Sequence, residues 1–153
     1  MGPKLKTGDK QSPEGFYAVN LKALNPNSRY HLSFNLGFPN EFDRAHGYTG
    51  SYLMVHGDCV SVGCYAMGDK QIEEIYTLVA QALQHGQAEV PVHVFPFKMT
   101  RENLLAYQGS KWLGFWRQLK PAYDFFEQYH LPPIMLVRDK RYELDVLNSQ
   151  RNF

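Results

Sequence analysis

Apolar and polar residues alternate over residues 30–36, which is the period of a half-buried β-strand. A short apolar run at 15–19 follows a proline-containing turn, and a third apolar run at 52–55 leads directly into His56. Residues 25–28, Asn-Pro-Asn-Ser, have the composition of a turn. The first third of the chain therefore predicts three strands separated by turns and loops.

A stretch with proline and two glycines at 38–50 predicts a loop, and further along the chain the apolar residues take the spacing of an amphipathic helix. Asp69 stands where a helix N-cap belongs, and Gly86 stands where the helix should end. We therefore expect a helix over 69–85. Its apolar stripe is explained by core packing and comprises Ile72, Ile75, Tyr76, Val79 and Leu83.

The last third of the chain is helical by the same criterion. An apolar helical face follows Ser110, which can cap its start, and Pro121 should kink or split the helix. We expect this helix over 110–129, with further strands at 90–97 and 134–137. The predicted fold class is mainly β with added helices, an α+β fold.

The composition is that of one globular domain over residues 1–153. Hydrophobic residues make up 44% and charged residues 20%, which argues against a disordered chain. The formal net charge of +1, without a concentrated basic patch, argues against nucleic-acid binding, and no stretch is apolar and long enough for a transmembrane segment. Residues 1–9 do not form a signal peptide. The chain nevertheless opens abruptly, and we expect N-terminal residues of the full-length protein to precede Met1.

Two cysteines, Cys59 and Cys64, lie close to His56 along the chain. A thiol is a useful nucleophile only as the thiolate, so a catalytic cysteine needs a nearby base or a positive field. His56 can supply the base for Cys64. Gly63 allows a tight turn before that cysteine, which can aim backbone N–H groups at a developing oxyanion. The segment predicts a cysteine nucleophile for acyl transfer.

Residue types alone leave two other interpretations open. Most lone cysteines are buried and inert. His56, Cys59 and Cys64 are also potential zinc ligands, but zinc needs a fourth group and tighter Cys–Cys spacings, so we expect no metal site. We expect Cys59 to point away from Cys64 into the core, because a disulfide between them would block the nucleophile.

The run His56-Gly57, followed by Ser61-Val62-Gly63-Cys64, resembles the active-site motif of the L,D-transpeptidase (YkuD-type) family. A second resemblance lies upstream. There, Gly8-Asp9 and the sequence Ser-Pro-Glu-Gly-Phe-Tyr at 12–17 are similar to the turn-and-strand signature of that family.

The chain departs from the family pattern in three ways. Val62 stands where a histidine is usual, Ala66 stands where an arginine is usual, and the loop between His56 and Cys64 is short. The short loop, together with the sequences at 2–6, 25–29 and 55–59, resembles the YafK-like branch of the family. Members of that branch include amidases that release lipoprotein from peptidoglycan.

The resemblance implies an L,D-transpeptidase-like β-sandwich core with a C-terminal helical segment. It implies the periplasm or cell envelope of a Gram-negative bacterium, and peptidoglycan stem peptides with meso-diaminopimelate as partners, together with a peptidoglycan-linked lipoprotein. No cofactor is required. Cys64 would be the nucleophile and His56 its base, with the carbonyl of Gly57 orienting the imidazole. Gly63 and Ser61 would shape the oxyanion loop.

The resulting thioester would pass to water or to an amine. We expect an amidase. The short loop reduces one wall of the site, and Val62 and Ala66 replace polar groups that could hold an acceptor amine. An L,D-transpeptidase that forms cross-links or protein attachments is one alternative, and an inactive peptidoglycan-binding scaffold is another. Further candidate substrate-binding residues, each also explained as a turn, structural or exposed residue, are Asp58, Tyr65, Tyr48, Ser51 and His31.

Overall fold

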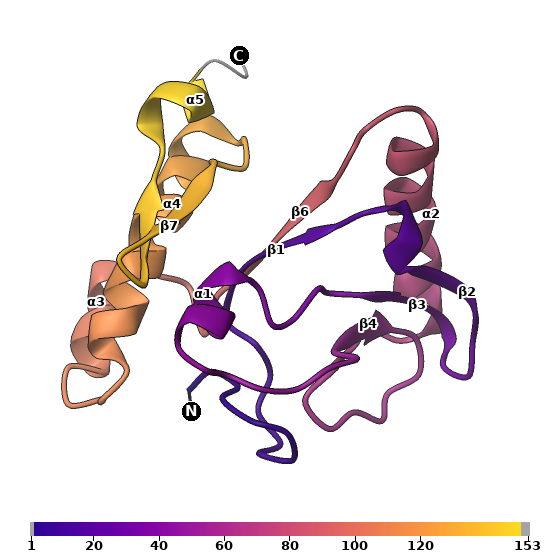
Figure 1. The fold of residues 1–153 in the computed structure, drawn as a ribbon, viewed down its shortest axis with the longest axis horizontal. Coiled ribbons are helices and arrows are strands. Elements are labelled where there is room, and N and C mark those ends of the chain that lie inside the picture. The colour runs from indigo at the N-terminus through magenta and orange to yellow at the C-terminus, as the bar shows by residue number, and fades with distance from the viewer. Residues whose placement is uncertain (1, 151–153) are drawn as a thin grey trace. The chain divides into compact units, whose positions relative to one another are not determined.

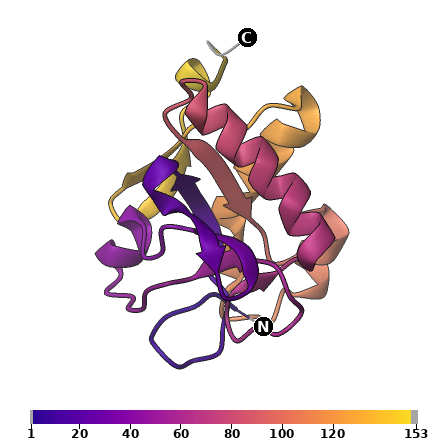
Figure 2. The same cartoon turned by 90° about the vertical axis from the view of Figure 1, so that its right-hand side faces the viewer.

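The computed structural model describes residues 2–150, which form two compact units. One unit is Pro3–Val94, and the other comprises residues 95–150 together with Gly2. Figures 1 and 2 show helices and strands in both units. The α+β fold class is therefore confirmed.

The unit Pro3–Val94 contains two sheets. In the smaller sheet, β1 (Gly15–Val19) pairs antiparallel with β6 (Val90–Val94). The larger sheet has the order β2-β3-β4-β5, with antiparallel pairing up to β4 and parallel pairing of β4 with β5. Its strands are β2 (Leu24–Ser28), β3 (His31–Asn35), β4 (Met54–His56) and β5 (Tyr65–Ala66).

A single long helix, α2 (Asp69–Gln84), packs against β3, β4 and β6, and it lies beside the strands of this unit in Figure 1. Its predicted apolar face is confirmed, because Ile72, Val79 and Leu83 are buried and Ile75 and Tyr76 pack against the core. Ile72 is fully inaccessible, as are Val19 of β1 and Leu36 just after β3. The core of this unit therefore fills the space between the helix and the two sheets.

The turn predicted at residues 25–28 is wrong, because these residues belong to β2. The side chain of Asn25 accepts a hydrogen bond from the backbone N–H of Asn27, and the pairing with β3 shifts register there. The turn chemistry therefore produces an irregular strand. The chain reverses one step later, at Arg29 and Tyr30.

The predicted loop at 38–50 contains a short helix, α1 (Glu41–Ala45). Asn40 and Asp43 form a capping box, in which each side chain accepts the backbone N–H of the other residue. Asp43 is buried and also accepts a hydrogen bond from the Tyr17 hydroxyl. The loop prediction missed this helix because so short a segment has no apolar periodicity to detect.

Both ends of α2 lie within one residue of the predicted bounds, but the N-cap differs. Gly86, with a left-handed φ of +100°, follows the helix and allows it to end as predicted. At the other end the N-cap is Gly68, so the expectation that Asp69 caps the helix is wrong. A 3₁₀ turn, η1 (Leu21–Ala23), completes the helical elements of this unit.

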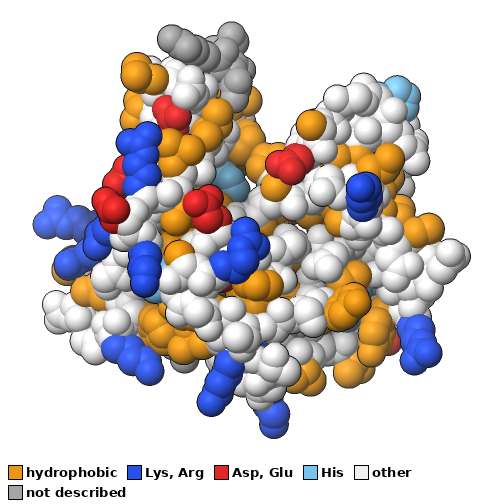
Figure 3. Space-filling model, viewed as in Figure 1, with side chains coloured by type: hydrophobic (Ala, Val, Ile, Leu, Met, Phe, Trp, Pro, Cys, Tyr) orange, Lys and Arg blue, Asp and Glu red, His pale blue; other side chains and the backbone are white. Residues whose placement is uncertain are grey.

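The second unit is built on α4 (Leu113–Tyr129), preceded by α3 (Arg101–Ala106) and followed by a β7–β8 hairpin and a terminal helix. The later elements are β7 (Met135–Arg138), β8 (Arg141–Leu144) and α5 (Val146–Gln150). On the face drawn in Figure 3, lysine and arginine side chains are dispersed and do not form one patch.

Two details of α4 differ from the sequence-based expectation. The helix begins three residues after Ser110, whose hydroxyl accepts the backbone N–H of Trp112 ahead of the first turn. Pro121 does not split the helix. Proline removes one helical hydrogen bond, and the burial of Trp116 and Leu119 on the same helix offsets that loss.

Candidate active site

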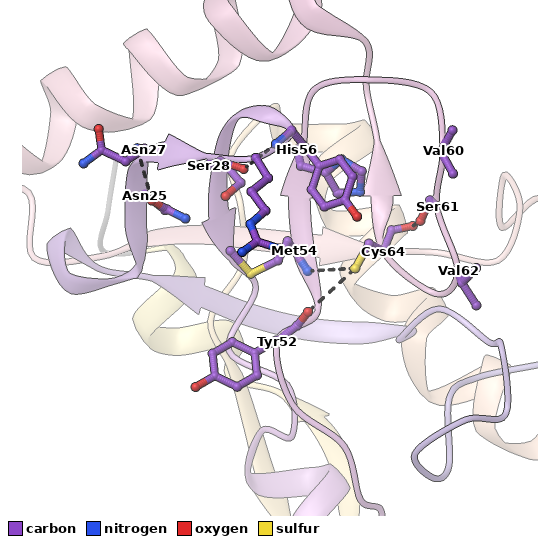
Figure 4. A pocket seen from close by; sticks show the side chains of 13 residues that line it. Asn25, Asn27, Ser28, Tyr52, Met54, His56, Val60, Ser61, Val62 and Cys64 are labelled. Carbon is purple, nitrogen blue, oxygen red and sulfur yellow. Dashed lines mark hydrogen bonds between the residues drawn. The ribbon is translucent and has the colours of Figure 1, made fainter.

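The unit Pro3–Val94 contains a cavity of about 1020 Å³, shown in Figure 4. The segment that carries Val60, Ser61 and Val62 lies on one side of it, and Asn25 and Asn27 lie on the other. The cavity is lined by Asn25, Asn27, Ser28, Arg29, Tyr30, Ser33, Tyr52, Met54, His56, Val60, Ser61, Val62 and Cys64. The two residues predicted as nucleophile and base therefore share one cavity.

His56 is the last residue of β4 and pairs with Ser33 on β3. Its side chain is buried, with 2% exposed. The ring nitrogen Nδ1 lies 2.5 Å from the carbonyl oxygen of Gly57. Because a carbonyl can only accept, Nδ1 carries a proton, and in the neutral imidazole Nε2 then holds the lone pair that a general base needs. The aromatic ring of Tyr30 lies beside the imidazole, with 4.8 Å between the ring centroids.

Gly57 is held from both sides. Its backbone N–H is shared between the carbonyl oxygens of Tyr30, at 3.0 Å, and Leu32, at 3.1 Å. A Cβ on this residue would lie 2.7 Å from the Tyr30 carbonyl oxygen and 2.7 Å from Asp69 Oδ1. Glycine is therefore required here by close approach of its neighbours, and this packing fixes the carbonyl that orients His56.

The first turn of α2 braces the start of the loop between His56 and Cys64. Asp69 Oδ1 accepts the backbone N–H of Asp58 at 2.8 Å, and the carbonyl of Asp58 accepts the N–H of Gly68 at 3.0 Å. The carbonyl of His56 in turn accepts the N–H of Met67 at 2.8 Å. Asp69 thus anchors the loop and does not cap the helix.

Cys64 lies immediately before β5 and is partly exposed. Its sulfur accepts the backbone N–H of Met54 at 3.4 Å and lies 3.7 Å from the carbonyl of Tyr52, drawn as dashed lines in Figure 4. The Ser61 hydroxyl donates to the carbonyl of Cys64 at 2.7 Å, which fixes the end of the loop.

Gly63 precedes Cys64 in a left-handed conformation, with φ of +86°. A Cβ at this position would lie 2.8 Å from the backbone oxygen of Gln11. Both facts agree with the tight turn predicted before Cys64. The oxyanion donors expected from this turn stay a prediction.

The expectation that Cys59 fills the core is wrong, because it is an exposed free cysteine. The carboxylate of Asp58 accepts its backbone N–H, and Asp58 itself has a left-handed φ of +60°. This local turn projects the loop into solvent. Among residues 2–150, no three His, Cys, Asp or Glu side chains are grouped so that they could hold a metal ion.

The five weaker substrate-binding candidates are not among the described residues that line the cavity. His31 pairs with Glu73 of α2 at 2.7 Å, and the hydroxyl of Tyr65 donates to the carbonyl of Pro13. Tyr48 packs against the core, where burial raises the pKa of its hydroxyl. Burial likewise raises the pKa of Tyr65. The other two candidates, Ser51 and Asp58, are exposed.

The structure adds cavity residues that the sequence did not single out. Arg29 and Tyr30 come from the turn between β2 and β3, and Tyr52 precedes β4. Tyr52 has a left-handed φ of +54° and is 78% exposed. The local sequence pattern does not predict that these residues line the cavity, because they reach it through the pairing of β3 with β4.

Residues 1–94 match the L,D-transpeptidase catalytic domain (YkuD), and the chain therefore belongs to that family. It is 53% identical over 142 residues to YafK of Escherichia coli, a protein that its name assigns to the L,D-transpeptidases. That match covers 93% of this chain and 58% of the relative, so the chain spans little more than half of the relative's length.

The fold also resembles that of the helical cell shape determining protein Pgp2 from Campylobacter jejuni. The TM-score is 0.51 at 19% identity, and the match covers 89% of this chain and 60% of Pgp2. A second Pgp2 structure, of a point mutant, also gives 0.51, at 22% identity over 82% of this chain and 43% of the other. No helix within residues 2–150 is long and apolar enough to span a bilayer.

Proposed function

We propose that this chain is a cysteine-dependent acyl-transfer enzyme of the cell envelope that acts on peptidoglycan at meso-diaminopimelate amide bonds. The observation that carries the proposal is the shared cavity of Cys64 and His56, in which the imidazole is buried and oriented by the Gly57 carbonyl. Membership of the L,D-transpeptidase family supports the reaction class and the peptidoglycan substrate.

In the first half-reaction, Nε2 of His56 takes the thiol proton and Cys64 Sγ attacks the amide carbonyl carbon. A C–S bond forms as the oxyanion develops. When the intermediate collapses, the C–N bond breaks and the imidazolium gives its proton to the departing amine. The products of this step are a thioester on Cys64 and a free amine.

In the second half-reaction we propose that water attacks the thioester, with His56 again as the base. A C–O bond forms, the C–S bond breaks, and Cys64 recovers its proton. Hydrolysis is favoured over transfer because two loop residues at the cavity, Val60 and Val62, are about 70% exposed and carry no group that could hold an acceptor amine. The full reaction would release a peptidoglycan-linked lipoprotein from its diaminopimelate residue, in the periplasm.

The test is incubation with diaminopimelate-containing muropeptides, with and without linked lipoprotein, and analysis of the products by mass. We expect a free carboxylic acid and a released amine, with loss of both on Cys64→Ala. Cys59→Ala is the matched control, since Cys59 is exposed and absent from the cavity lining, and it should retain activity. If Cys59→Ala abolishes turnover and Cys64→Ala does not, the nucleophile is wrongly assigned.

Excess acceptor amine separates hydrolysis from transpeptidation. The same thioester reacts with either nucleophile, and water at roughly 55 M prevails unless a bound amine is well positioned. We expect the free acid to dominate at every amine concentration. Dominance of an amine-exchanged product would replace the amidase with a transpeptidase and leave the roles of Cys64 and His56 unchanged.

A further inference from the structure

The cavity lining has an uneven charge. Among the described residues it contains no aspartate or glutamate, and Arg29 is its only lysine or arginine. The other polar side chains on the same side, Asn25, Asn27 and Ser28, are neutral. A cavity with one fixed cation and no carboxylate favours an anionic group on the molecule that enters it.

Arg29 is also available to a ligand. Its side chain is exposed and forms no ion pair or hydrogen bond with any residue in the described part of the chain. Elsewhere in the same unit, Lys4 is paired with Asp9 at 2.9 Å, and Arg44 donates to the carbonyl of Pro39 at 2.5 Å. Arg29 therefore differs from these two cations, because it lines the cavity and has no partner among the described residues.

The backbone that carries Arg29 is tied to the proposed catalytic residues. Ser28 accepts the backbone N–H of Tyr30 through its hydroxyl, at 3.1 Å, and pairs with His31 across the turn. The carbonyl of Tyr30 accepts the N–H of Gly57, the residue that orients His56. These hydrogen bonds fix the position of the Arg29 backbone relative to His56. A group bound by Arg29 would therefore be held at a fixed distance from the reacting bond.

We propose that Arg29 is a specificity-determining residue that binds a free carboxylate of the donor peptide. The inference rests on the proposed function, because it assigns a substrate group to that site. A guanidinium matches a carboxylate through two parallel N–H donors, which fixes direction as well as charge. The carboxylate belongs either to the diaminopimelyl acyl group, which carries one at the far end of its carbon chain, or to the leaving residue.

Binding to a catalytically inert protein tests Arg29 independently of turnover. The Cys64→Ala protein is titrated by calorimetry with meso-diaminopimelyl-glycine, and with two derivatives amidated at the diaminopimelyl or at the glycine carboxylate. We expect Arg29→Gln to weaken binding of the unmodified peptide about 10- to 100-fold. The derivative that lacks the recognised carboxylate should bind with the same affinity to the Cys64→Ala protein and to the Cys64→Ala protein that also carries Arg29→Gln. That derivative identifies which carboxylate Arg29 binds.

Two further variants act as controls. Lys22→Gln removes a positive charge from an exposed residue of the same unit that does not line the cavity, and it should leave affinity unchanged. Arg29→Lys keeps the charge without the planar fork and should restore only part of the affinity. Circular dichroism and thermal unfolding of Arg29→Gln should match those of the parent.

The proposal is overturned if Arg29→Gln binds all three peptides as the parent does, if it weakens all three equally, or if the unmodified peptide does not bind. Failure of the proposed function has a different signature. In that case the Arg29-dependent binding is present, but the protein with Cys64 intact releases no amine from the same peptide.

Discussion

At the scale of single residues, the candidate site depends on groups that act through the backbone. The imidazole of His56 is oriented by a carbonyl, and the sulfur of Cys64 receives a backbone N–H. Both contacts need the chain to be held at fixed positions, and at Gly57 the neighbours leave no room for a side chain. Substitutions at such positions disturb the chemistry by moving the backbone.

Gly57→Ala should show this effect directly. The added Cβ would meet the Tyr30 carbonyl oxygen and Asp69 Oδ1, each at 2.7 Å, so the loop must shift. We expect a loss of about 1–3 kcal/mol in the free energy of unfolding, together with at least a tenfold loss of kcat/KM. Urea unfolding and steady-state kinetics measure the two effects.

Gly114→Ala is the matched control for that substitution. Gly114 lies in α4, and a Cβ there meets no heavy atom within 4 Å. Alanine lowers the entropy of the unfolded chain, so we expect unchanged activity and a gain of up to about 1 kcal/mol. Equal behaviour of the two alanine variants would contradict the close-approach argument.

Tyr30 contributes its ring to the cavity beside the imidazole. Its removal should admit water to the base and loosen the imidazole, whereas the hydroxyl takes no part in that contact. We expect Tyr30→Ala to lower kcat about tenfold and Tyr30→Phe to stay within twofold of the parent. An equally large loss in Tyr30→Phe would show that the hydroxyl matters instead.

At the scale of elements, the sequence predicts the strands and helices of the core well. The apolar runs and the helical stripe coincide with β1, β3, β4 and α2 to within a few residues. These patterns succeed because burial of one face repeats with the period of the element. The prediction failed at residues 25–28, where side-chain hydrogen bonds that resemble a turn form an irregular strand.

The site was predictable only where its residues form one local segment. His56, Gly57, Ser61 and Cys64 lie on a single strand-and-loop unit, and the structure brings His56, Ser61 and Cys64 to one cavity. Arg29 and Tyr30 reach it from a separate turn through pairing of β3 with β4. That proximity depends on sheet register, which a local motif does not contain.

Asp69 links two elements, because its carboxylate joins the first turn of α2 to the loop after β4. Asp69→Ala removes the acceptor of the Asp58 N–H, and we expect a three- to tenfold lower kcat with a loss of about 1 kcal/mol in stability. Asp69→Asn keeps an oxygen acceptor and should retain most of the activity. The comparison requires kinetics and urea unfolding on both variants, and an inactive Asp69→Asn would show that charge, rather than the hydrogen bond, is needed.

At the scale of the whole molecule, the proposed chemistry is confined to one unit. The residues that match the family, 1–94, end where the unit Pro3–Val94 ends. The cavity, with the candidate residues Cys64 and His56, lies within it. Residues 95–150 form a compact unit around α4, which agrees with the helical segment expected beyond the family core.

The stability of the unit Pro3–Val94 should depend on pH through His93 of β6. Burial lowers the pKa of this histidine to about 4, and its ring lies edge-on to Phe16 with 5.0 Å between centroids. An unfolded chain protonates histidine near pH 6.5, so unfolding takes up a proton between about pH 6.5 and pH 4. The contribution of His93 to stability is therefore present above pH 6.5 and is lost as the pH falls through this window.

Urea unfolding at pH 7 and pH 5 measures that loss. We expect the free energy of unfolding to fall by about 2 kcal/mol at most between these values because of His93 alone. In His93→Phe, which keeps an aromatic ring against Phe16 but cannot take up a proton, most of this pH dependence should disappear. His85→Gln is the control, since His85 is exposed at the end of α2 and its replacement should leave the pH dependence unchanged. If His93→Phe retains the full dependence, the proton taken up on unfolding binds elsewhere.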